Sequence, residues 1–232
     1  IYGLQENYEK AEKIIQELLP IVPKMYGENH MNTIALYTNT ANMYVNQKRY
    51  NEATEYYLKS FNLLKELHGM KNINTLMSLQ ILGVHYHNIG KLKEAEESLE
   101  SWCKYTGELD PSLIRTVLYA ERMSMLATIY ARRNKLQAAI ELQTKAIDIL
   151  REKNKKRNDP SLIVYLTFLS SLYMGLKNWD EAAKPLSEAL IIQIDSKGYK
   201  DESTLKTMQQ LASIYISAKS YVSAKSLLAP CF

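Results

Sequence analysis

A spacing of tyrosine, bulky apolar residue and alanine recurs along the chain and limits what it can fold into. The bulky residue follows the tyrosine by six positions and the alanine by nine. Six sets share the pattern: Tyr2/Tyr8/Ala11, Tyr44/Tyr50/Ala53, Tyr86/Leu92/Ala95, Tyr130/Leu136/Ala139, Tyr173/Trp179/Ala182 and Tyr215/Tyr221/Ala224. Successive tyrosines lie 42, 42, 44, 43 and 42 residues apart. This period predicts stacked supersecondary units, which usually act by presenting a surface.

A second set of residues precedes five of the tyrosines at offsets of minus seven, minus four and minus three. These offsets place the set and the tyrosine on one helical face. A polar break and a second helical pattern follow each tyrosine, so each unit should be a helix, a tight turn and a second helix. The residue at minus three is always small: Ala41, Gly83, Ala127, Ser170 and Ala212.

These units resemble a known family. Ala41/Tyr44, Ala127/Tyr130 and Ala212/Tyr215, each with alanine nine residues after the tyrosine, resemble tetratricopeptide repeats. The period near 42 and the connector YGENHMNT (residues 26–33) are similar to the longer repeats of kinesin light chains and nephrocystin-type proteins. The resemblance implies an all-α, right-handed superhelical solenoid of about eleven helices. It also implies one domain over 1–232, divided into 1–33 (partial), 34–75, 76–116, 117–163, 164–204 and 205–232 (partial).

The 44-residue step between Tyr86 and Tyr130 marks one irregular unit. The glycine that could cap its second helix, Gly107, comes 21 residues after Tyr86, against 25 in three other units. This predicts a second helix shorter by about one turn. A following helix that opens near Pro111 should be longer by almost two turns. The insertion is either neutral or a protruding helix edge that touches a partner.

Prolines and connector glycines predict where other helices end. Pro20 and Pro23 fall late in the first complete helix, where a bend or an early end is expected because each lacks a backbone donor. Pro185 should kink a later helix. Three connectors share glycine, five residues, then threonine, and their glycines are expected to cap helices in the left-handed conformation: Gly27/Thr33, Gly69/Thr75 and Gly198/Thr204.

The sequence gives little support for catalysis. Of the four histidines, His85 and His87 are two apart on a helix and point in different directions, which makes a poor metal pair. No cysteine or histidine cluster has zinc-ligand spacing, and no phosphate-binding glycine loop is present. We therefore expect no enzyme, no cofactor, no metal and no small-molecule substrate.

Composition also bears on location and partners. No stretch of about 18 uncharged apolar residues occurs, so membrane insertion is not expected. Two cysteines, Cys103 and Cys231, fit reduced thiols, and we expect a cytoplasmic, intracellular protein that could associate with the cytoskeleton. The chain lacks an initiator Met and opens inside a repeat, so it looks like part of a longer protein.

A basic run comprises Arg151, Lys153, Lys155, Lys156 and Arg157. Such a run is usually a solvated helix end whose charges complement the helix dipole. The alternative is contact with an acidic protein, a tubulin surface or RNA phosphate. No aromatic residues interleave with it, so nucleic acid is not favoured as a partner.

The strongest functional signal lies opposite the packed face of the first helices, at offsets of minus six and minus two from each tyrosine. We call these ten positions the uncharged stripe: Thr38, Asn42, Gln80, Val84, Ser124, Thr128, Thr167, Ser171, Gln209 and Ser213. Outward helix faces are usually rich in lysine and glutamate, yet none of these ten is charged and nine are polar.

By the resemblance, the stripe would line the concave inside of the superhelix. Amides and hydroxyls there could pair with the backbone of an extended peptide, or small polar residues could simply fit a crowded inner face. A mixed-sign rim surrounds the stripe, without the regular lysine, asparagine and arginine set by which some tetratricopeptide domains clamp a chaperone's terminal carboxylate. The predicted peptide-binding groove consists of Thr38, Asn39, Asn42, Asn46, Gln80, Val84, His87, Asn88, Ser124, Thr128, Arg132, Thr167, Ser171, Gln209 and Ser213.

The leading hypothesis is a non-catalytic scaffold or adaptor that binds a protein or peptide partner in this groove. The alternative is a structural subunit of a multi-subunit cytoskeletal, ciliary or organellar assembly, which would use its convex surface and open ends. A nucleic-acid-binding solenoid rests only on the basic run. A regulatory arm of an enzyme domain elsewhere in a longer protein is the fourth reading.

Overall fold

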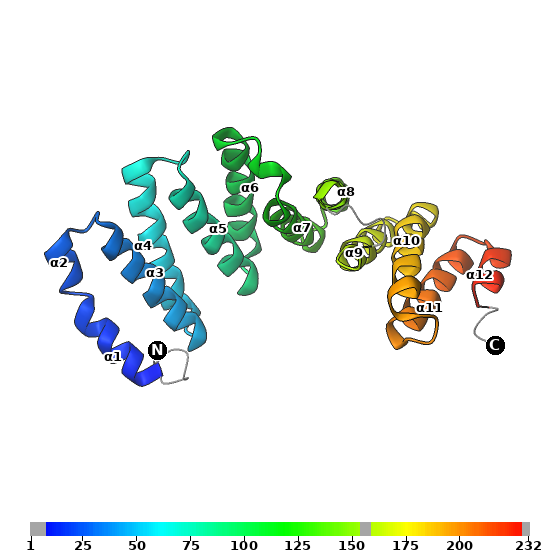
Figure 1. The fold of residues 1–232 in the computed structure, drawn as a ribbon, viewed down its shortest axis with the longest axis horizontal. Helices are drawn as coiled ribbons and strands as arrows, with labels where there is room; N and C mark the ends of the chain where they lie inside the picture. Colours follow the sequence, from blue (N-terminus) through cyan, green and yellow to red (C-terminus); the bar gives the residue numbers. More distant parts are fainter. Residues whose placement is uncertain (1–7, 154–158, 229–232) are drawn as a thin grey trace. The chain divides into compact units, whose positions relative to one another are not determined.

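A computed structural model describes residues 8–153 and 159–228 of the 232-residue chain (Figure 1). All regular structure in these two ranges is helical. The helices are α1 (Tyr8–Leu18), α2 (Val22–Tyr26), α3 (Met31–Asn46), α4 (Tyr50–His68), α5 (Ile73–Asn88), α6 (Leu92–Leu109), a 3-10 helix η1 (Leu113–Arg115), α7 (Val117–Arg132), α8 (Leu136–Lys153), α9 (Leu162–Gly175), α10 (Trp179–Lys197), α11 (Glu202–Ser217) and α12 (Tyr221–Leu228).

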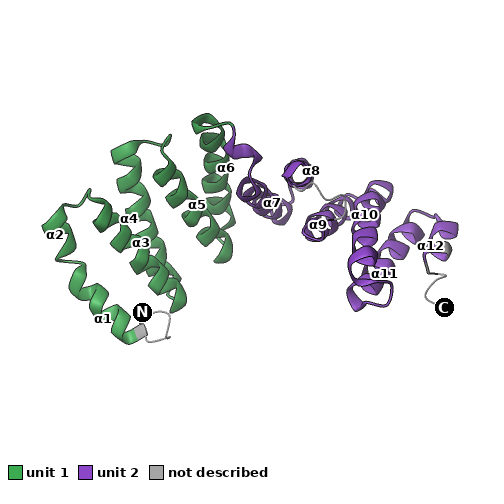
Figure 2. Ribbon diagram, viewed as in Figure 1, with its two compact units in different colours: residues 1–111 green, residues 112–232 purple. Residues whose placement is uncertain are grey.

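The chain divides into two compact units, which Figure 2 colours separately. Unit 1 is residues 1–111 and unit 2 is residues 112–232. Within unit 1, α3 packs on α4 and α5 on α6, and within unit 2 the pairs are α7 with α8, α9 with α10 and α11 with α12. This all-α repeat architecture confirms the fold expected from the tyrosine spacing.

Each hairpin turn is closed by the main chain of a repeat tyrosine. Four residues after the tyrosine the backbone adopts positive φ, and the next N–H donates to the tyrosine carbonyl at 2.8 to 3.0 Å. This pattern is the Schellman motif, which satisfies carbonyls that a helix end leaves unpaired. Only one of the five positive-φ residues is glycine: Lys48, Gly90, Asn134, Lys177 and Lys219.

The small residue three before each tyrosine lies in the core, as predicted. Ala41 and Ala127 have no exposed surface, and Ser170 is 1% exposed. The Ser170 hydroxyl donates to the Ala182 carbonyl of the paired helix at 2.8 Å. At Gly83 a Cβ atom would lie 3.0 Å from Leu99 Cγ, so α5 and α6 approach too closely there for a side chain.

The repeat alanines and tyrosines share this core to different extents. Four alanines nine residues after a tyrosine are fully buried: Ala53, Ala95, Ala139 and Ala182. Tyr44 and Tyr86 are buried, whereas Tyr130, Tyr173 and Tyr215 are half-buried. Tyr2 lies outside the described residues.

The early proline pair divides the first helix as the sequence predicts. α1 ends at Leu18, two residues before Pro20, and the five-residue α2 contains Pro23. The described residues therefore hold eleven longer α-helices and one short one. Helix α10 continues through the buried Pro185.

The helix lengths predicted around the 44-residue step between Tyr86 and Tyr130 are wrong for both helices. Helix α6 continues through Gly107 to Leu109 and has 18 residues, one fewer than α4. Gly107 lacks the positive φ of Gly27, Gly69 and Gly198, the three connector glycines whose capping role is confirmed.

Helix α7 has the same 16 residues as α3 and α5, because Thr116 and not Pro111 sets its start. The Thr116 hydroxyl accepts a hydrogen bond from the Tyr119 N–H at 3.2 Å, which caps the helix. The extra residues form a connector around η1, and the boundary between the two units falls there.

Candidate functional site

In unit 1 the uncharged stripe runs along α3 and α5. The Thr38 hydroxyl lies 3.2 Å from its own helix's Ile34 carbonyl and 2.8 Å from the buried Ser60 hydroxyl of α4. The Tyr57 hydroxyl of α4 donates to Asn42 Oδ1 at 2.5 Å, and burial raises the pKa of that tyrosine. Two stripe residues on α3 are therefore fixed by the helix behind them.

The remaining groove residues of unit 1 vary in exposure. Asn39, Asn46 and Asn88 are exposed, whereas Gln80, Val84 and His87 are half-buried. His87 Nδ1 lies 3.4 Å from Asn88 Oδ1, and its buried Nε2 has no hydrogen-bond partner among the described residues.

In unit 2 four of the five stripe hydroxyls donate their proton to a carbonyl of their own helix. Thr128 donates to Ser124 at 3.0 Å and Thr167 to Ile163 at 2.7 Å. Because a hydroxyl has one proton and two lone pairs, these groups remain available as acceptors only.

Two serines of the stripe in unit 2 also donate within their own helix, and several groove residues of this unit are exposed. Ser171 donates to the Phe168 carbonyl at 2.7 Å and Ser213 to the Gln209 carbonyl at 3.0 Å. Ser171, Gln209, Ser213 and Arg132 are exposed. The stripe in this unit therefore presents hydroxyl oxygens and one exposed amide, and the exposed Arg132 is the charged residue of the predicted groove in this unit.

An apolar pocket of about 240 Å³ adjoins the stripe in unit 1, between α3, α4 and α5. Thr38 and Asn39 line it, together with Met31, Met77 and Ile81. Sequence reasoning missed these apolar residues because it examined only offsets minus six and minus two on the outward helix face. Offset minus nine, which holds Ala35 and Met77 in unit 1, was a signal that could have revealed part of this lining.

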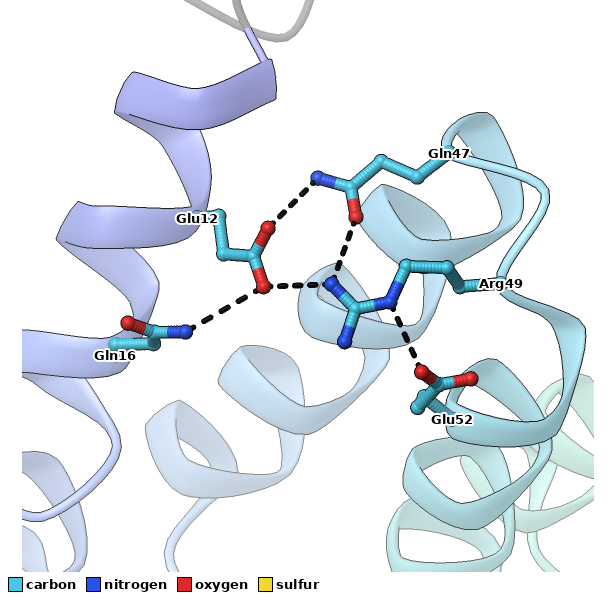
Figure 3. Close-up of polar contacts among 5 residues, drawn as sticks. All are labelled: Glu12, Gln16, Gln47, Arg49 and Glu52. Atoms are coloured by element: carbon cyan, nitrogen blue, oxygen red, sulfur yellow. Dashed lines mark hydrogen bonds and ion pairs between the residues drawn. The ribbon is translucent and has the colours of Figure 1, made fainter.

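A polar network fastens α1 to the first complete hairpin (Figure 3). Arg49 Nη1 lies 2.7 Å from Glu12 Oε1, and Arg49 Nε lies 2.9 Å from Glu52 Oε1. Gln47 and Gln16 donate to the Glu12 carboxylate at 3.2 and 3.4 Å. The pKa of Arg49 is raised by its hydrogen bonds to the two glutamates, so its charge is retained at any physiological pH.

His85 is a structural residue, in contrast to its neighbour His87. It is 5% exposed, and its Nε2 lies 2.8 Å from the Thr54 hydroxyl of α4. Burial lowers its pKa, which keeps the ring neutral. The described residues contain no group of three or more histidine, cysteine, aspartate or glutamate side chains that could hold a metal ion.

Two further predictions can be placed in the structure. No helix in the described ranges is both long enough and apolar enough to cross a membrane. In the basic run, the Arg151 guanidinium lies 2.7 Å from Glu188 Oε2, and Lys153 is exposed at the end of α8. Lys155, Lys156 and Arg157 lie outside the described residues.

Comparison with known families decides what these hairpins are. Models of the tetratricopeptide repeat match residues 35–101 and residues 120–160. The chain contains tetratricopeptide repeats. The matched ranges include the pairs Ala41/Tyr44 and Ala127/Tyr130 on which the resemblance was based.

Solved structures and a curated protein are similar to this chain. The TPR-like repeats of a putative kinesin light chain from Podosopora anserina are 21% identical, with a TM-score of 0.69 over 86% of this chain and 93% of that one. BtubC (BKLC) from P. vanneervenii is 17% identical, with a TM-score of 0.70 over 97% of this chain and 88% of that one. These structural likenesses show the fold.

The curated protein is the RxLR effector protein SFI4 of Phytophthora infestans (strain T30-4). It is 24% identical over 221 residues, which cover 89% of this chain. The chain spans 61% of the length of that relative.

Proposed function

We propose that this chain is a non-catalytic scaffold or adaptor whose uncharged stripe binds a segment of a partner protein. The tetratricopeptide fold generally mediates protein–protein interaction, which supports a binding role. The observation that carries the proposal is the chemistry of the stripe: hydroxyl oxygens and exposed amides occupy helix faces that solvent alone would leave to charged residues.

The stripe complements the main chain of an extended peptide. Peptide N–H groups need acceptors, and the stripe hydroxyls that already donate within their own helix offer acceptors. Peptide carbonyls need donors, which the carboxamides of exposed asparagine and glutamine residues supply. Main-chain recognition of this kind gives affinity, while neighbouring pockets give specificity.

A triple substitution tests the proposal. Asn42→Glu, Thr128→Glu and Ser171→Glu place negative charge in both units. The fold should tolerate Asn42→Glu because a carboxylate can accept the Tyr57 hydroxyl bond. Pull-down with mass spectrometry should show partner proteins captured by the wild type and lost by this variant.

A matched control uses the same residue changes on the second helices of the same hairpins. Asn62→Glu in α4, Thr144→Glu in α8 and Ser196→Glu in α10 alter exposed side chains away from the stripe. The control should capture the same proteins as the wild type. Equal capture by the wild type and both variants would contradict the stripe as the binding surface.

A structural subunit is the second candidate, because exposed apolar residues occur on the first two and the last two helices that the structure describes. Ile14 and Met25 are 43% and 68% exposed, and Ile216 and Val222 are 53% and 85% exposed. Large contiguous patches of exposed apolar surface mark protein–protein interaction sites. Concentration-dependent association in sedimentation experiments, reduced by Val222→Lys, would support this function over the first.

A further inference from the structure

The apolar pocket of unit 1 has buried aliphatic residues at its base and exposed methionines at its mouth. Ile34 of α3 and Leu64 of α4 are 3% and 4% exposed, so they form its deep part. Met31 of α3 and Met77 of α5 are 45% and 54% exposed and also line it. Methionine is flexible and polarisable, and it adapts to the shape of an incoming apolar group.

The lining of this pocket carries no charge. It consists of aliphatic, methionine, hydroxyl and amide side chains from α3, α4 and α5. Burying a charged group among them would cost desolvation energy that no opposite charge offsets. The pocket therefore favours a neutral apolar side chain over an acidic or basic one.

Two carboxamides beside the apolar lining have unused hydrogen-bonding capacity. Asn39 is exposed and belongs to the predicted groove, and Asn74 is exposed near the start of α5. Within the described part of the chain, neither carboxamide has a hydrogen-bond partner. Each can donate to a carbonyl and accept from an N–H, which is the pairing that an extended backbone offers.

The combination of an apolar lining and two adjacent carboxamides belongs to unit 1 and is not a general property of the repeat. At nine positions before the tyrosine, unit 1 has Ala35 and Met77. The same offset in unit 2 holds Glu121, Val164 and Lys206. Two charged residues at this offset would make the equivalent position in unit 2 polar.

We propose that this pocket takes one bulky, uncharged apolar side chain, aliphatic or phenyl, from an extended partner segment whose backbone pairs with Asn39 and Asn74. The proposal rests on the proposed function and adds the anchor residue to it. The volume is sufficient, since an engineered cavity of about 150 Å³ lined by similar side chains accommodates benzene. The pocket gives the partner a fixed register along α3 and α5.

The test uses small probes, so that no natural partner is needed. The full chain carries ¹³C-labelled methionine methyl groups, with the Met31 and Met77 signals assigned by Met→Leu substitution. It is titrated with N-acetyl-phenylalanine methylamide, N-acetyl-leucine methylamide and N-acetyl-aspartate methylamide. We expect saturable shifts at Met31 and Met77 with the phenylalanine and leucine probes, and an affinity for the aspartate probe lower by about tenfold or more.

A charge at the mouth should remove binding. Met77→Lys is expected to weaken the phenylalanine probe by about tenfold or more, because the ammonium group must be desolvated. Since this substitution removes the Met77 signal, the Met31 methyl reports the titration. Val164→Lys is the matched control, since it adds the same charge at the same offset in unit 2, at a side chain that is 74% exposed. Probe binding lost in the first variant and retained in the second supports the pocket.

Three results would overturn the inference. The first is the absence of saturable shifts at Met31 and Met77, and the second is equal binding of the aspartate and phenylalanine probes. The third is a dimer that Met77→Lys dissociates, which would make a second copy of the chain the occupant. None of these results depends on the stripe variant, so the pocket can fail while partner capture by the stripe stands, and the reverse.

Discussion

The two units are built from the same hairpin but expose different chemistry on their first helices. In unit 1 the ends of α3 and α5 present Met31 and Met77 around an apolar pocket. In unit 2, helix α11, the first helix of the last hairpin, presents a Lys206–Glu202 ion pair at the corresponding turn. The difference shows that the tyrosine framework fixes the hairpin while leaving the outward positions free to vary, so binding properties can differ between units without a change of fold.

The chain offers a separate probe for each unit. Its two tryptophans are Trp102 in α6 and Trp179 in α10. Trp179→Phe leaves a fluorescence signal from unit 1, and Trp102→Phe leaves one from unit 2. Denaturant unfolding followed in these two backgrounds therefore reports each unit by itself.

The largest expected effect comes from a cavity-creating substitution in the core of one unit at a time. Leu99 is fully buried in α6 and Leu186 is 2% exposed in α10. Each Leu→Ala substitution should lower the free energy of unfolding of its own unit by about 2–5 kcal/mol, through lost apolar burial and a residual cavity. The tryptophan signal of the other unit should be unchanged, and equal destabilisation of both signals would show that the units unfold as one body.

The close approach of α5 and α6 gives the next effect. Gly83→Ala forces a Cβ to within 3.0 Å of Leu99, and we expect a net loss of about 1 kcal/mol. At the same offset in unit 2, Ala127→Gly should also lose about 1 kcal/mol, because glycine disfavours the helix interior. Urea unfolding measures both, and stabilisation by Gly83→Ala would contradict the tight helix spacing in unit 1.

The left-handed turn residues give effects that are no larger and that have opposite sign in the two units. Gly90 in unit 1 has φ of 78°, and Gly90→Ala should destabilise by about 1 kcal/mol. Lys177 in unit 2 has φ of 57°, and Lys177→Gly should stabilise by a few tenths to about 1 kcal/mol. Thermal unfolding of each variant checks the sign, and loss of stability in both would indicate that the side chain of Lys177 contributes more than its backbone strain costs.

Mild acid should affect unit 1 alone. All four histidines lie in unit 1, and burial lowers the pKa of His85 in the folded chain. The unfolded chain, in which histidine titrates near 6.5, binds that proton more readily. The free energy of unfolding of unit 1 therefore falls as the pH drops below about 6.5.

A titration in the two tryptophan backgrounds tests this difference. Unit 1 should lose stability between about pH 7 and pH 5.5, where unit 2 has no histidine to titrate. His85→Gln should flatten the pH dependence of unit 1. An unchanged slope in that variant would assign the effect to another group.

The sequence predicted the framework because the same residues must meet in every hairpin. Tyr44, Ala41 and Ala53 pack where their spacing placed them, and the connector glycines cap helices as expected. The error at Gly107 arose because a glycine can also lie inside a helix, and α6 continues through it to Leu109. The start of the following helix, α7, is set by the Thr116 cap.

The candidate site was less accessible from the sequence. The uncharged stripe could be read from offsets, but the sequence did not show that Thr128 and Thr167 donate their hydroxyl protons within their own helices. The pocket needs three helices, and Leu64 of α4 comes between its α3 and α5 neighbours in the chain. Its apolar lining therefore became visible only when the hairpins were packed. The stripe and the pocket remain proposals for binding.

The main-chain closure of the hairpin turns bears on how such a chain can grow. Each turn is completed by a bond between two backbone atoms of one repeat, from the N–H five residues after the tyrosine to the tyrosine carbonyl. No side chain from a neighbouring repeat takes part in that bond. A duplicated repeat can therefore form its turn without contacts from neighbouring repeats. The side chain of the lysine or asparagine at the positive-φ position is then free to be selected for other functions.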